Sequence, residues 1–230
     1  LILFGHPQYG KSTVLAKLAY DLQESRLYRP FLFSLRNYSS ASSLEAQLKL
    51  EQRFDNIGSD VLILDGLDEL KEEQRDNVVS EIAMLSENYP SIVIVLSCRL
   101  SHKKVMTVSG FESLYLQPMS DKDLNEYIRT NCADPETFLR DASRSKLMPF
   151  LYVPFFLKES LAYFAAHRCI PADKVTIYEY FIDRALERDC NRKKNRASRI
   201  TPKARLYPHL EHLAFSMLMS QRMDVSHDEL

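Results

Sequence analysis

Short apolar runs alternate with stretches of helical periodicity in the first half of this 230-residue chain. The apolar runs lie near residues 1–4, 30–35, 61–65, 92–97 and 113–116, and the helical stretches near 11–25, 43–54, 72–88 and 121–131. Uninterrupted apolar runs are typical of strands that are buried on both faces of a parallel sheet. Because strands and helices alternate, we expect an α/β fold with helices on both faces of a parallel sheet.

The strand pattern disappears after about residue 120, and helical periodicity continues alone. Four further helices are expected near residues 135–146, 154–167, 175–190 and 203–220, with prolines between several of them. The pattern therefore predicts an α/β domain at 1–118, a helical lid domain at 119–172 and part of a second small domain at 173–230. Both ends of the chain resemble cuts within a longer protein, so we expect effector and sensor regions of the same chain to be missing.

Composition changes this picture little. The chain is 45% apolar and 27% charged, as in ordinary globular proteins. A net charge of −1 gives no general attraction to nucleic acid or to a membrane surface. No apolar run approaches the ~20 residues of a membrane span. Four cysteines without metal-type spacing fit a reducing compartment, so we expect a cytoplasmic protein.

One segment fits the phosphate-binding pattern G-x-x-x-x-G-K-[ST]. It reads Gly5-His6-Pro7-Gln8-Tyr9-Gly10-Lys11-Ser12 and is followed by Thr13. An apolar run precedes it and a helical stretch follows it, so the helix N-terminus would face the phosphates. Lys11 can reach the β- and γ-phosphates, and the hydroxyl of Ser12 can bind Mg²⁺. A chance match is the alternative, but motif, strand and helix agree on a nucleoside triphosphate site.

A second motif supplies carboxylates. Asp65 ends the apolar run 61–64, and ligands of parallel sheets bind outside the carboxyl ends of the strands. Asp65 is therefore expected to hold Mg²⁺ together with Ser12. Glu69 is our first choice for the general base that polarises the attacking water, and Asp68 is the second. Either of these two residues can instead cap the helix that follows.

The apolar run at 92–96 is followed by Ser97-Cys98-Arg99. Arg99 would face the same crevice, where it can contact the γ-phosphate or stabilise the charge that develops on it. The alternative is an arginine that only extends from the sheet edge into solvent. A basic run at 192–196, with Arg199, offers phosphate contacts to a nucleic acid, but without interleaved aromatic residues it is better explained as a solvated loop.

These motifs together resemble the NACHT domains of the STAND class of P-loop NTPases, which share an AAA+-like fold. The string Asp-Gly-Leu-Asp-Glu at 65–69 resembles their extended Walker B motif, and residues 5–13 resemble their Walker A motif. Further similar segments are 30–36, 93–99, 118–124, 153–157 and 178–187, the last at the start of a winged-helix domain. The resemblance implies that Pro154 packs on the adenine; by itself, a proline there indicates only the start of a helix.

The chain also departs from the family. Gln8 stands where many relatives have glycine, and Tyr9 where many have a small residue. The winged-helix histidine that contacts the nucleotide in many relatives has no clear counterpart, so the winged-helix domain is expected to be partial.

The resemblance implies an ADP/ATP switch with slow ATP hydrolysis, which self-associates when ATP is bound and controls an effector in immunity or antiviral defence. The alternative is an AAA+-type motor or loader that acts on nucleic acid or protein. Such enzymes usually have glutamate directly after the Walker B aspartate, where this chain has Gly66. A scaffold that binds nucleotide without hydrolysis is a further alternative.

Overall fold

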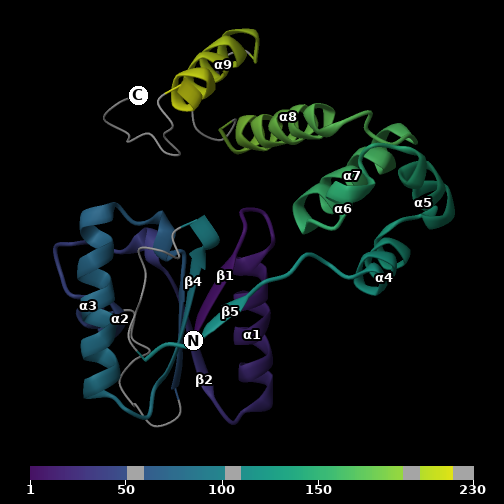
Figure 1. Ribbon diagram of the computed structural model, residues 1–230. Coiled ribbons are helices and arrows are strands. Elements are labelled where there is room, and N and C mark those ends of the chain that lie inside the picture. Colours follow the sequence, from purple (N-terminus) through teal and green to yellow (C-terminus); the bar gives the residue numbers. More distant parts are fainter. Residues whose placement is uncertain (51–59, 102–109, 194–202, 220–230) are drawn as a thin grey trace. The chain divides into compact units, whose positions relative to one another are not determined.

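The computed structural model describes residues 1–50, 60–101, 110–193 and 203–219. The chain divides into two compact units, Leu1–Ile177 and Tyr178–Leu230. In the first unit, a five-stranded parallel sheet has the order β2-β3-β4-β1-β5 (Figure 1). Its strands are β1 (Ile2–Gly5), β2 (Arg29–Ser34), β3 (Asp60–Asp65), β4 (Val93–Arg99) and β5 (Ser113–Tyr115). The expected parallel sheet is thus confirmed.

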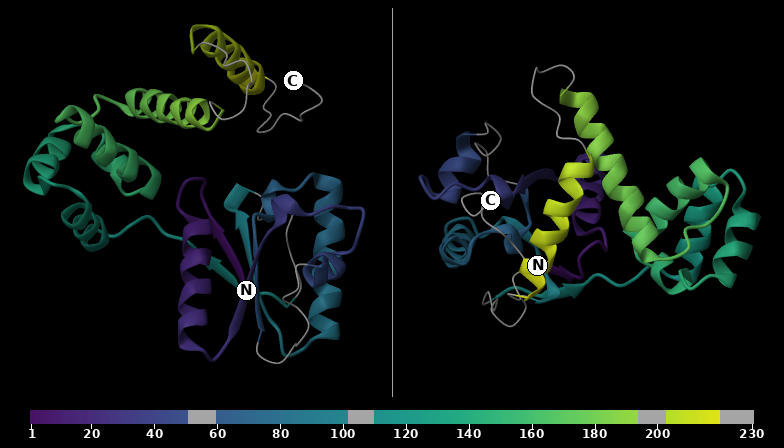
Figure 2. Two further views of the ribbon diagram at one scale, coloured as in Figure 1. Left: turned by 180° about the vertical axis from the view of Figure 1, so that it is seen from behind. Right: turned by 90° about the horizontal axis from the view of Figure 1, so that it is seen from above.

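Alternate residues of the strands point to opposite faces, and each face has its own helical cover. Leu3, Ile63 and Val95 pack against α1 (Lys11–Ser25), whereas Leu62 and Leu64 belong to the core under α2 and α3. Helix α2 spans Leu44–Leu50 and α3 spans Glu72–Asn88. Views from two sides show α1 and α3 on opposite faces (Figures 1 and 2). The last residues of the helix expected at 43–54 lie outside the described part.

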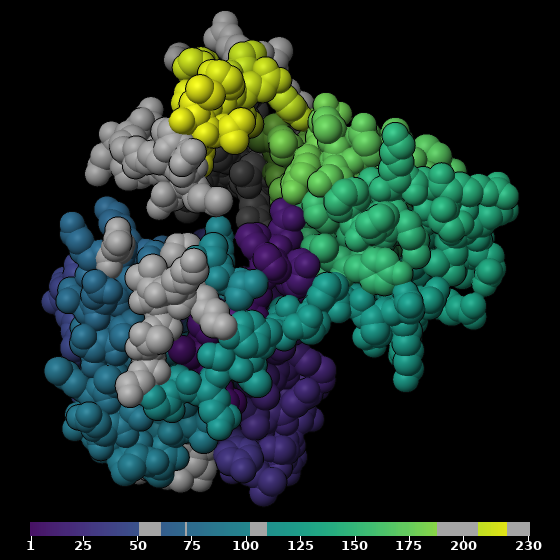
Figure 3. Space-filling model, in the orientation of Figure 1, coloured from purple at the N-terminus to yellow at the C-terminus, as the bar shows by residue number. Residues whose placement is uncertain are grey.

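Four helices follow the sheet within the first unit: α4 (Asp121–Asn131), α5 (Pro135–Arg144), α6 (Met148–Leu151) and α7 (Pro154–His167). Ser120 and Asp123 form a reciprocal capping box at the start of α4, and Asp134 caps α5. The helices share an apolar core that includes Ile128, Phe138 and Leu157, and they pack closely in the space-filling view (Figure 3). Helix α6 had no counterpart in the sequence pattern, since one turn is too short to show periodicity.

Helix α8 (Lys174–Lys193) begins in the first unit and continues into the second, which also contains α9 (Lys203–Met219). Tyr207 donates a hydrogen bond to Asp183 across these two helices at 3.0 Å. The domain boundaries at 118 and 172 and the winged-helix assignment stay predictions. Residues 194–196 and Arg199 of the basic run lie outside the described residues. No helix of the described part has the length and apolar character needed to cross a membrane.

Candidate nucleotide-binding site

The phosphate-binding loop connects β1 to α1, and the side chain of Lys11 binds the backbone at the start of the loop. Gly10 precedes the helix with a φ of 87°, and Gln8 has a φ of 69°, a left-handed conformation that glycine adopts without strain. The Nζ of Lys11 donates to the carbonyl oxygens of Gly5 at 3.1 Å and His6 at 3.4 Å. Burial lowers the pKa of Lys11, and the negative charge of Asp68 opposes that shift.

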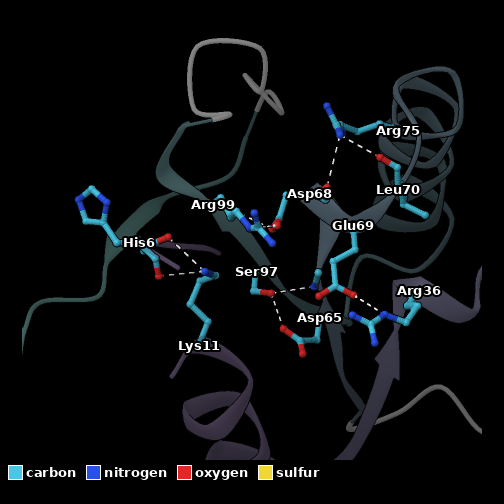
Figure 4. A network of polar contacts seen from close by, with 12 residues as sticks. His6, Lys11, Arg36, Asp65, Asp68, Glu69, Leu70, Arg75, Ser97 and Arg99 are labelled. Atoms are coloured by element: carbon cyan, nitrogen blue, oxygen red, sulfur yellow. Dashed lines mark hydrogen bonds and ion pairs between the residues drawn. The ribbon is translucent and has the colours of Figure 1, made fainter. Parts of the chain in front are cut away.

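Asp65 at the end of β3 is held by a serine from the neighbouring strand. The hydroxyl of Ser97 in β4 donates to Oδ1 of Asp65 at 2.5 Å and accepts the N–H of Gly66 at 2.8 Å (Figure 4). Ser97 is fully buried, so water does not compete for these bonds. The carboxylate of Asp65 is thereby held in one orientation at the carboxyl end of the sheet.

Gly66 allows the turn that follows to fold back on itself. It has a φ of 89°, and its carbonyl accepts the N–H of Glu69 at 2.9 Å in the 3₁₀ turn η2 (Leu67–Glu69). A Cβ at position 66 would lie 3.1 Å from Cδ and 3.3 Å from Oε2 of Glu69. The carboxylate of Glu69 therefore lies close to Gly66, and a side chain at position 66 would force Glu69 to shift.

The two candidate bases have different partners. Asp68 accepts the backbone N–H of Arg99 at 2.9 Å and the Nε of the same residue at 2.7 Å, and its side chain is 4% exposed. Glu69 is 32% exposed and pairs with Nε of Arg36 at 3.0 Å, from the turn η1 (Leu35–Asn37) that follows β2. Because both oxygens of Asp68 bind Arg99, the geometry favours Glu69 as the group that can accept a proton from water.

These groups surround one cavity of about 550 Å³. Its lining comprises Pro7, Gln8, Gly10, Lys11, Ser12, Thr13, Asp65, Gly66, Asp68, Glu69, Ser97, Arg99, Pro154, Phe155 and Lys158. The sheet thus brings the predicted magnesium ligands Ser12 and Asp65 to the same cavity. Pro154, the first residue of α7, lies in its wall as well. This volume lies in the range of ordinary small-molecule sites.

Among the described residues, three of the predicted nucleotide contacts do not line this cavity. Gly5 is the last residue of β1, and a Cβ added to it would lie 3.1 Å from Cβ of Leu116. His6 and Tyr9 have ring centroids 5.3 Å apart and line a separate hollow of about 310 Å³. Their roles in nucleotide binding stay predictions.

Four residues of the site were missed as functional groups in the sequence. Ser97 was noticed only as part of a polar triplet, and Arg36 only as part of a strand motif. Phe155 falls only within the segment 153–157 of the family resemblance, and Lys158 belongs to no motif. The last two follow Pro154 by one and four positions, and the i, i+4 spacing puts Lys158 on the same helix face as Pro154. That spacing was the signal that could have found the lysine.

The donor set fits a triphosphate with Mg²⁺. A serine hydroxyl and a carboxylate are the hard oxygen ligands that Mg²⁺ prefers, and it commonly binds few protein ligands beside phosphate oxygens. The N-terminus of α1 and Lys11 provide the positive end of the site. Ser12 and Asp65 are the residues that would hold the ion.

No protein-family model matches the sequence, and no curated protein matches it either. The chain is similar to the Aeropyrum pernix ORC1 protein, solved in complex with DNA, with a TM-score of 0.50 and 15% identity over 95% of this chain and 65% of that one. It is also similar to the Holliday junction branch migration motor RuvB of Thermotoga maritima, with a TM-score of 0.45 and 16% identity over 78% of this chain and 60% of that one. For C. elegans PCH-2 the TM-score is 0.42 and the identity 12%, over 62% of this chain and 39% of that one.

The chain thus spans less than two thirds of the length of each of these three structures. At such identities the similarity concerns the fold. The parallel sheet, the phosphate-binding loop after β1 and the similarity to the ORC1 protein define an α/β P-loop NTPase fold, as expected from the sequence.

Gly66→Ala tests the turn that carries Glu69. We expect its free energy of unfolding to fall by about 2 kcal/mol, since alanine is strained at a φ of 89° and its Cβ displaces Glu69. Gly110→Ala is the matched control: its φ is 86° but no atom lies within 4 Å of an added Cβ, so it should lose only about 1 kcal/mol. Equal losses in denaturant titrations of the two variants would contradict the packing of Glu69 on Gly66.

Proposed function

We propose that this protein binds a nucleoside triphosphate with Mg²⁺ in the cavity at the carboxyl end of the sheet and hydrolyses its terminal phosphoanhydride bond. The observation that carries the proposal is the common lining of one cavity by Lys11, Ser12, Asp65, Glu69 and Arg99. Three separate strand ends contribute these groups, as expected of a site at the edge of a parallel sheet.

Each residue has a distinct part in this proposal. Lys11 binds the β- and γ-phosphates, and Ser12 and Asp65 hold Mg²⁺, which when bound would neutralise phosphate charge. Glu69 orients the attacking water and accepts its proton. Arg99 contacts the γ-phosphate and stabilises the charge that develops there. The ion pair of Glu69 with Arg36 is largely exposed, so it is weak enough to open when the base acts.

We further propose that hydrolysis is slow and that the chain is the nucleotide-binding core of a NACHT-type STAND switch. ADP would stabilise a closed form through the wall formed by α7, and ATP would favour an open form that self-associates and activates an effector in defence or immunity. Such a shift requires that ATP bind the open form more tightly than the closed one. The support is the Asp-Gly-Leu-Asp-Glu string at 65–69, in which the side chain of Glu69 packs against Gly66.

Lys11→Ala tests the phosphate-binding assignment. We expect the affinity for ATP and ADP with Mg²⁺ to fall by a factor of about 100, because the variant loses a charge-assisted contact to phosphate. Lys17→Ala, on the exposed side of the same helix, is the matched control and should leave affinity unchanged. Calorimetric titration measures both. An unchanged affinity in Lys11→Ala would refute the proposed site.

Glu69→Gln tests the assignment of the base. The variant should keep nucleotide affinity while its turnover falls by about 10²-fold or more, since glutamine cannot accept the proton. Glu24→Gln, an exposed position on α1, serves as the control. Phosphate release at saturating ATP is the measurement. Full turnover in Glu69→Gln would transfer the role of base to Asp68, in spite of its two bonds to Arg99.

A motor or loader ATPase that acts on nucleic acid is the second candidate. Its support is the similarity to the ORC1 protein solved with DNA, which extends over 95% of this chain. Turnover separates the candidates, because a motor cycles faster on its polymer whereas a switch stays slow. We expect single- and double-stranded DNA or RNA to leave the rate of phosphate release unchanged within twofold. A stimulation of tenfold or more would instead support the motor.

A further inference from the structure

Asp68 acts on both of the cations that the proposed function assigns to the terminal phosphates, Arg99 by contact and Lys11 through its charge. It binds Arg99 through both carboxylate oxygens, with contacts of 2.7 and 2.9 Å. Among the neighbouring charges, that of Asp68 has the largest effect on the pKa of Lys11, which it raises against the lowering by burial. An anionic group of the protein thus attracts the same two side chains that an incoming phosphate needs (Figure 4).

The two partners differ in their freedom to move. The side chain of Asp68 is 4% exposed. Asp68 belongs to a turn in which backbone carbonyls before and after it accept hydrogen bonds. Arg75 donates to the carbonyl of Leu70 at 2.9 Å, and the carbonyl of Gly66 accepts the N–H of Glu69. The side chain of Arg99 is 39% exposed and lines the cavity. Arg99 is therefore the half of the pair that can turn into the cavity, while Asp68 stays in place.

We propose that Asp68 is a specificity-determining residue that competes with the γ-phosphate for Arg99. This inference rests on the proposed function. A triphosphate must exchange the carboxylate of Asp68 for its own terminal phosphate at Arg99, and a diphosphate, which lacks that phosphate, leaves the pair intact. Asp68 thereby weakens triphosphate binding relative to diphosphate binding and brings the two affinities closer together. A protein that alternates between ADP and ATP needs affinities close enough for exchange.

The alternative role of Asp68, as a group that aims Arg99 at the phosphate, predicts the opposite sign. An arginine whose side-chain Nε and backbone N–H both bind one carboxylate is held in a single position. Were that position the productive one, removal of the carboxylate would lower triphosphate affinity. The sign of the change therefore decides between competition and positioning.

The test compares dissociation constants for ADP and for a non-hydrolysable ATP analogue, each with Mg²⁺, by calorimetric titration of the intact chain. In Asp68→Asn, the amide oxygen can still accept the backbone N–H of Arg99, but the charge is lost. We expect the ratio of the ADP constant to the analogue constant to rise about fivefold, the size expected for loss of a partly exposed ion pair. Asp68→Ser removes the same charge with a smaller side chain and should give the same rise.

Two further variants complete the design. In an Arg99→Ala background, Asp68→Asn should leave the ratio unchanged, because the group for which Asp68 competes is gone. Asp21→Asn, which removes an exposed carboxylate paired with Lys17 on α1, is the control for charge alone. An unchanged or lowered ratio in both Asp68 variants would overturn the inference. So would an equal rise when Asp68→Asn is made in the Arg99→Ala background. Undiminished nucleotide binding in Lys11→Ala would instead refute the proposed function itself, so the two failures are distinguishable.

Discussion

The position of β4 between β1 and β3 is the constraint on which the site depends. The strand that leads into the phosphate loop and the strand that ends in Asp65 are not neighbours; each pairs with β4 instead. A buried hydroxyl at the end of β4, that of Ser97, bonds both Asp65 and the N–H of Gly66. Through this serine the intervening strand orients the carboxylate that we propose as a magnesium ligand, and it carries Arg99 two residues further on.

The cavity concentrates charge of both signs at the end of one sheet. Lys11 and Arg99 provide positive charge and Asp65, Asp68 and Glu69 negative charge, all within its lining. Partly buried charges interact more strongly than charges in water, so each tends to find a partner within the protein. Asp68 pairs with Arg99, and Glu69 with Arg36. An anionic ligand therefore enters a set of existing ion pairs, and its binding free energy includes their rearrangement.

The helical segment contributes to the same cavity through the first turn and a half of α7. Pro154 begins this helix, where its missing N–H has no intrahelical partner to lose, and its ring faces the cavity with Phe155 and Lys158. The core of the segment contains Leu157 and Leu161 from the same helix. One helix thus joins a packed apolar core to the wall of the cavity, so a ligand in the cavity would contact the segment that follows the sheet.

Much of this architecture is local information and was predictable from the sequence. Apolar runs located the five strands of the described sheet. The phosphate-loop pattern singled out Lys11 and Ser12, which line the cavity, because such a loop needs particular residues at fixed spacing. The partners of the charges were not predictable. Ser97 meets Asp65, Arg99 meets Asp68 and Arg36 meets Glu69 across more than 30 residues of chain. Strand order and register decide these pairs, and a periodic pattern carries neither; they arise only when non-local pairing brings the strand ends together.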